Sequence, residues 1–145
     1  MKIPRMTVIT LGVSDLARST AFYREIFSTP PITENEGVTF FPLPGVWLSL
    51  YPLEKLAEDI GEEVQLPAPG PFRGFTLAYN ARNKDELISI FARVAEAGAH
   101  IAKAPQDTFW GGFSGYFCDP DGHYWEVAWG PMFEFNEHGD LRFKA

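Results

Sequence analysis

The chain carries the same order of sequence patterns twice, once on each side of a proline-rich segment at 67–71. In each half, a run rich in β-branched and aromatic residues comes first, at 6–13 and at 75–81, and a helical pattern follows it. Sliding one half over the other by about 68 residues pairs Thr10 with Ala78. We therefore expect two copies of one folding unit, joined by a stiff connector.

Each half contains one amphipathic helix with its own start signal. In the first half, Ser14 or Asp15 can accept a hydrogen bond from the first helical turn and so cap the helix. In the second half, Asn83 is followed three residues later by Glu86, which resembles a capping box. Gly98 is placed to end this second helix.

Short strand patterns follow each helix. They lie at 38–41, 46–51, 99–102, 115–118 and 124–129. The last two are joined by Asp119-Pro120-Asp121-Gly122, where proline at the second position and glycine at the fourth favour a type I turn in a hairpin. An acidic segment at 53–65 predicts a short exposed helix between the halves.

These patterns predict an α+β protein built from two βαβββ modules. We place the modules at 6–52 and 74–131, a linker at 53–73 and a C-terminal tail at 132–145. A chain of 145 residues suits one domain. Neither half can bury both faces of its sheet alone, so the two modules are expected to pair.

Composition excludes several classes of function. There are 19 acidic and 12 basic side chains, which give a net charge of −7 and argue against binding to nucleic acid. No apolar run is long enough to cross a bilayer, so no membrane partner is expected. The single cysteine, Cys118, favours a reducing, cytoplasmic location and excludes a cysteine-based zinc cluster.

Two segments of the sequence resemble segments of one known protein superfamily. The run GYFCDPDGHYWEV at 115–127 looks like the last hairpin of the vicinal oxygen chelate superfamily, and LGVSDLARS at 11–19 resembles its first strand and helix. This superfamily includes glyoxalase I, bleomycin-resistance proteins, extradiol dioxygenases and fosfomycin-resistance enzymes. The resemblance implies that the two modules curl their mixed sheets around one cavity, with the helices on the outside.

The resemblance also implies where a divalent metal would bind. In its enzymes four strands each supply one ligand, and these positions correspond to Val8, Ser49, Thr76 and Glu126. A catalytic zinc needs about three protein ligands. Valine has no donor atom, and neutral hydroxyls are poor substitutes for imidazole or carboxylate. We therefore expect no metal and no other cofactor.

Strand alternation predicts which other side chains would line the cavity. The expected ligand-binding residues are Val8, Thr10, Trp47, Ser49, Tyr51, Thr76, Asn80, Trp110 and Tyr124. The set is apolar and aromatic with a few polar points, as in small-molecule pockets. Trp47 and Tyr51 could equally fill a closed interior, and Asn80 could cap backbone groups. Trp110 lies beside glycines, which suits a mobile flap or a contact with a second subunit.

Glu126 is the candidate catalytic residue. Facing an apolar cavity, its carboxyl would have a raised pKa and could act as a general base. The alternative is a structural role in which Glu126 binds Ser49 or Thr76. A buried carboxylate needs a partner, and Arg73 and Arg82 are candidates.

The sequence thus predicts a small-molecule protein of the glyoxalase and bleomycin-resistance group. We expect it to bind an aromatic or apolar molecule in a metal-free cavity and to form a homodimer. An enzyme is the alternative: a lyase or isomerase resembling lactoylglutathione lyase, with Glu126 as proton shuttle. A module with a filled interior is a third reading, in which no cavity is open to solvent.

Overall fold

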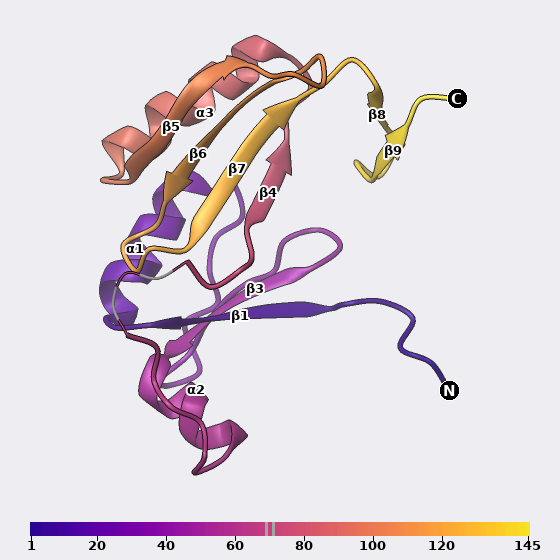
Figure 1. The fold of residues 1–145 in the computed structure, drawn as a ribbon. Coiled ribbons are helices and arrows are strands. Elements are labelled where there is room, and N and C mark those ends of the chain that lie inside the picture. The colour runs from indigo at the N-terminus through magenta and orange to yellow at the C-terminus, as the bar shows by residue number, and fades with distance from the viewer. Residues whose placement is uncertain (69, 71) are drawn as a thin grey trace. The chain divides into compact units, whose positions relative to one another are not determined.

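A computed structural model describes residues 1–68, 70 and 72–145 (Figure 1). The chain divides into two compact units, Met1–Pro71 and Phe72–Ala145, and each is described separately below. The stiff connector expected at 67–71 includes Pro69 and Pro71, which lie outside the described residues.

The first unit contains a three-stranded mixed sheet and two helices. In chain order its elements are β1 (Val8–Val13), α1 (Leu16–Ile26), β2 (Thr39–Phe41), β3 (Trp47–Pro52) and α2 (Leu53–Ile60). The strand order is β1-β3-β2, with β1 parallel and β2 antiparallel to β3. A fourth strand is reduced to a single antiparallel bridge between Ile32 and Phe40.

The core of this unit lies between α1 and one face of the sheet. The Asp15 side chain caps α1 by accepting a hydrogen bond of 3.0 Å from the Arg18 backbone N–H. Tyr23 from this helix is fully buried, and its ring stands 6.2 Å from that of Phe41 in β2. Leu11 and Leu50 complete the buried face from β1 and β3. Alternate residues of these strands therefore point away from the helix.

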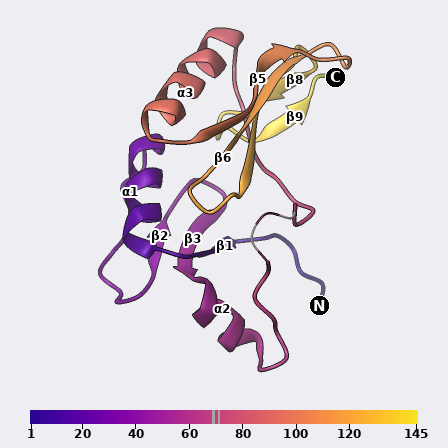
Figure 2. The ribbon, with the colours of Figure 1, turned by 60° about the vertical axis from the view of Figure 1, so that its left-hand side comes forward.

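The second unit repeats this topology with one more complete strand. Its elements are β4 (Leu77–Asn80), α3 (Lys84–Glu96), β5 (His100–Asp107), β6 (Phe113–Cys118), β7 (Tyr124–Trp129), β8 (Phe133–Phe135) and β9 (Leu141–Phe143). The main sheet has the order β4-β7-β6-β5, with β4 parallel to β7 and the other pairs antiparallel. Figure 2 shows α3 running alongside this sheet.

Both ends of α3 have the expected start and stop residues. Asn83 accepts a hydrogen bond of 2.8 Å from the Glu86 N–H. Glu86 does not return to the Asn83 N–H as in a full capping box; its carboxylate binds the Tyr79 hydroxyl and the Arg82 N–H instead. At the other end, Gly98 has a φ of 96°, and the hydrogen bond from Ala99 N–H to the Val94 carbonyl completes a Schellman motif.

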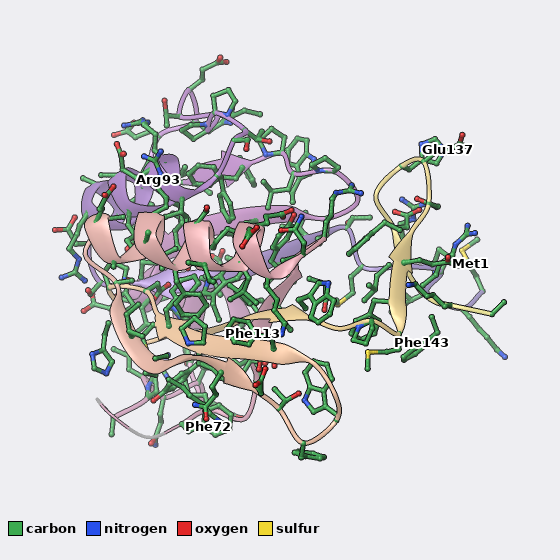
Figure 3. All side chains as sticks on the ribbon, turned by 90° about the horizontal axis from the view of Figure 1, so that it is seen from above. Met1, Phe72, Arg93, Phe113, Glu137 and Phe143 are labelled. Carbon is green, nitrogen blue, oxygen red and sulfur yellow. The ribbon has the colours of Figure 1, made fainter. Side chains whose placement is uncertain are left out.

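The C-terminal tail forms a separate two-stranded hairpin, β8–β9. Phe133 pairs with Phe143 and Phe135 with Leu141, so these four apolar side chains share one face. Figure 3 shows Glu137 at the loop of this hairpin and Phe143 at its opposite end.

The predicted α+β class with mixed sheets is confirmed, whereas several boundaries differ. The acidic helix ends at Ile60 rather than at residue 65, and the strand expected at 99–102 continues to Asp107. The strand expected from residue 75 begins only at Leu77. None of the helices in the described part of the chain is long and apolar enough to span a membrane.

Candidate functional site

In the second unit, the face of the sheet opposite α3 presents the candidate catalytic residue. Along β7, Trp125 and Val127 are buried on the helix side. Tyr124, Glu126 and Ala128 alternate with them and therefore point to the opposite face. This open face is the candidate site of the second unit.

Glu126 lies in the middle of a row of residues that crosses all four strands. It pairs with Ala78 on β4 and with Tyr116 on β6, and Tyr116 pairs in turn with Lys103 on β5. Residues directly opposite one another in a sheet project on the same side. The row therefore brings a carboxylate, a phenol and an ammonium group to one face.

Tyr116 is the neighbour of Glu126 across the β6–β7 strand pair. Both side chains are half-buried. Burial and then the neighbouring carboxylate raise the pKa of the Tyr116 phenol, so it remains a neutral donor. The sequence carried a signal for this pair: residues 116 and 126 are each five residues from Asp121, which lies in the turn that sets the register of the hairpin.

The two arginines that the sequence suggested as partners of Glu126 lie elsewhere. The Arg82 guanidinium lies 5.1 Å from the centre of the Phe135 ring, and Arg73 is exposed. Within the described residues, no ion pair joins Glu126 to a lysine, arginine or histidine.

Other predicted residues of this unit lie around the row. Tyr124 is half-buried, and its ring meets that of Phe72 edge-on at 5.8 Å. Asn80 is half-buried beside Ala128. Thr76 is exposed and precedes the first paired residue of β4, so the strand position predicted for it is wrong.

Trp110 packs within its own unit rather than on the row. The loop before β6 is closed by hydrogen bonds of 3.0 Å between Thr108 and Gly112, one in each direction. A side chain at Gly112 would collide with the Trp110 ring, and one at Gly130 would meet the same ring. These glycines therefore allow the indole to lie close to the backbone.

In the first unit, the face opposite α1 is largely apolar and is considered by itself. Val8 pairs with Trp47, and their side chains are 44% and 41% exposed. Thr10 pairs with Ser49, which is buried. Tyr51 continues this face along β3 and is half-buried.

Phe40 also belongs to this face and was missed in the sequence. It pairs with Ser49, and its ring lies 5.9 Å from that of Trp47. Strand alternation carries the signal for it: Thr39 and Phe41 are buried on the helix side, so Phe40 between them points to the opposite face.

The residues at the four family ligand positions do not fit a divalent metal. Val8 offers no donor atom, and Ser49 and Thr76 offer only hydroxyls. The described residues contain no group of three or more His, Cys, Asp or Glu side chains that could hold a metal ion. His123 and Asp119 are both buried, and they bind each other at 2.9 Å across the β6–β7 turn.

Comparisons with known proteins agree with this fold. Residues 5–127 match the family model of the Glyoxalase/Bleomycin resistance protein/Dioxygenase superfamily. The metallothiol transferase FosB from Shouchella clausii is 31% identical over 134 residues, which cover 90% of this chain and 83% of that protein.

Solved structures show the same likeness. A glyoxalase-related enzyme from Fulvimarina pelagi superposes with a TM-score of 0.85 at 33% identity, covering 99% of this chain and 100% of that one. The fosfomycin-resistance protein FosX from Listeria monocytogenes gives a TM-score of 0.66 at 26% identity, covering 90% and 97% of the two chains.

Proposed function

Because this chain belongs to the Glyoxalase/Bleomycin resistance protein/Dioxygenase superfamily, we propose that it binds a small aromatic or apolar molecule without a metal. The chemistry of the four family ligand positions carries the proposal, since only Glu126 among them is a good metal ligand. Aromatic side chains on the open face of each unit, Trp47 in the first and Tyr124 in the second, supply apolar surface for a ligand.

Elemental analysis tests the metal part of the proposal. The protein should be purified without a chelator or histidine tag, incubated with zinc, manganese or nickel, and freed of unbound ions. We expect much less than one metal ion per chain, because Val8, Ser49 and Thr76 cannot supply strong ligands. A nearly stoichiometric metal would overturn this part of the proposal.

Thermal-shift screening with aromatic compounds tests the binding part. For any compound that stabilises the wild type, Trp47→Ala is expected to weaken binding about tenfold by removing a large aromatic surface. The matched control is Phe109→Ala, since Phe109 is fully exposed in the loop before β6. Equal losses of affinity in the two variants would contradict a ligand at Trp47.

An enzyme is the second candidate, and the Glu126–Tyr116 pair favours it. A half-buried carboxylate beside a phenol is suited to accept or deliver a proton, and the FosB relative is named a transferase. The substrates of fosfomycin-resistance enzymes and of lactoylglutathione lyases should be tried with the wild type and Glu126→Gln. Turnover in the wild type alone would support a lyase, isomerase or transferase; equal rates would exclude Glu126 as the base.

A cytoplasmic location is part of the same proposal. The only cysteine of the chain, Cys118, is a free and buried thiol, which is compatible with a reducing compartment. Fractionation of the cells that make the protein would test the location.

A further inference from the structure

The Glu126 carboxylate occupies the centre of the second unit's open face without a positive partner in that unit. Among the described residues of Phe72–Ala145, the nearest lysine along its row is Lys103, which pairs with Tyr116 two strands away. Lys84 is engaged elsewhere: its ammonium lies 3.7 Å from Asp107 and over the rings of Phe113 and Trp129. A partly desolvated carboxylate is most stable when a positive charge compensates it.

Tyr116 lies beside the carboxylate on the neighbouring strand but does not neutralise it. Burial and the charge of Glu126 raise the pKa of the phenol, which therefore keeps its proton. An ionised carboxylate has about four acceptor sites. A single neutral phenol beside the group therefore leaves acceptor sites for another donor.

The neighbours of Glu126 leave room for such a donor and supply aromatic surface. On the β4 side, its pairing partner is Ala78, whose methyl group is too small to cover the carboxylate. Along β7, the preceding residue on the same face is Tyr124, which meets Phe72 edge-on. Aromatic rings beside a carboxylate attract organic cations through the negative faces of the rings.

From this arrangement we propose that Glu126, aligned by Tyr116, binds the protonated amine of an aromatic ligand. This inference rests on the proposed small-molecule binding and adds the charge of the ligand to it. Tyr116 is then a positioning residue that acts through Glu126, and Tyr124 is the aromatic neighbour of the bound cation.

The same arrangement disfavours an anionic ligand at this face. A phosphonate or carboxylate placed beside Glu126 would meet a like charge, with Lys103 at the far side of Tyr116. The net charge of −7 adds a weak repulsion of the same sign.

Three probes with one aromatic body separate these alternatives: benzylammonium, benzyl alcohol and benzylphosphonate. Their affinities for the wild type should be measured by ligand-detected NMR at constant ionic strength. We expect benzylammonium to bind about tenfold more tightly than benzylphosphonate. Glu126→Gln should abolish this preference. Tyr116→Phe should weaken benzylammonium about threefold while the preference remains, because the carboxylate is retained but less well aligned.

Glu134→Gln is the matched control, since it removes one negative charge at an exposed position on β8. Its affinities should equal those of the wild type. Equal or tighter binding of benzylphosphonate by the wild type would overturn the inference and leave small-molecule binding intact, and this comparison needs no variant. An unchanged preference in a folded Glu126→Gln protein would also overturn it. Failure of all three probes to bind would count against the proposed function itself.

Discussion

Asp119 holds the β6–β7 turn with both of its carboxylate oxygens. Oδ1 accepts hydrogen bonds of 2.9 Å from the backbone N–H groups of Asp121 and His123, and Oδ2 lies 2.9 Å from Nδ1 of His123. Because both side chains are buried, Asp119→Ala would leave donors unsatisfied. We expect this variant to lower the free energy of unfolding by about 2–4 kcal/mol in urea titrations.

The control for this prediction is Asp107→Ala. The Asp107 side chain is exposed and lies 3.7 Å from the Lys84 ammonium in a long ion pair, so its loss should cost less than about 1 kcal/mol. Similar losses in the two variants would show that the turn does not depend on the Asp119 carboxylate.

Tyr79 makes stability sensitive to high pH. Burial, followed by the hydrogen bond and charge of Glu86, raises the pKa of Tyr79 from 10.0 to about 12. The unfolded chain releases this proton near pH 10, whereas the folded chain retains it to about pH 12. The stabilisation is therefore complete below pH 10 and is lost between pH 10 and about 12. Urea titrations across this window should show a steeper loss of stability for the wild type than for Tyr79→Phe; equal slopes would contradict the assignment.

At the scale of elements, Gly115 permits the close approach of β5 to β6. A Cβ at this position would lie 2.7 Å from both the Lys103 carbonyl oxygen and the Phe91 ring. Since two neighbours would have to move, Gly115→Ala should destabilise the protein by about 1–3 kcal/mol in thermal or urea unfolding. Gly139→Ala is the comparison: its site is open but its φ is 85°, so only backbone strain of about 1 kcal/mol is expected. A smaller effect at Gly115 than at Gly139 would contradict this view of the strand contact.

The helices and the β6–β7 hairpin could be predicted from the sequence, whereas the pairing of β5 could not. Local signals placed α1, α3 and this hairpin well, because Asp15, Asn83 and the turn at Asp119–Gly122 act on backbone groups within a few residues. The register of β5 was not predictable in this way. Its pairing with β6 shifts on both sides of Lys103, and the shifts depend on neighbours about a dozen residues away in the chain.

The candidate site was predictable to the extent that strand alternation determines it. Alternation correctly placed Glu126 and Tyr124 together on the face opposite α3, and Trp47 with Ser49 on the corresponding face of the first unit. To predict that Glu126 pairs with Tyr116, the register of the β6–β7 hairpin is needed as well as strand alternation. Thr76 was misplaced because strand propensity gave no sign that pairing starts only at Leu77.

At the scale of the whole molecule, the β8–β9 hairpin bears on the predicted homodimer. A two-stranded hairpin is marginally stable alone, so its apolar face needs cover. Phe143 is 75% and Leu141 is 44% exposed on the face that they share with Phe133 and Phe135, whereas Glu134 and Arg142 occupy the opposite face. A second copy of the chain offers the same apolar face, and two such faces in contact would each exclude water from the other.

This reasoning predicts that self-association depends on one face of β9 and not on the other. In light scattering coupled to size-exclusion chromatography, the wild type should have twice the mass of one chain. Phe143→Gln should shift the protein towards monomer, because an exposed aromatic anchor of the contact is lost. Arg142→Gln introduces glutamine on the opposite face of β9 and should leave the dimer intact. A wild type that is monomeric at high concentration, or a dimer that survives Phe143→Gln, would mean that this apolar face has another role.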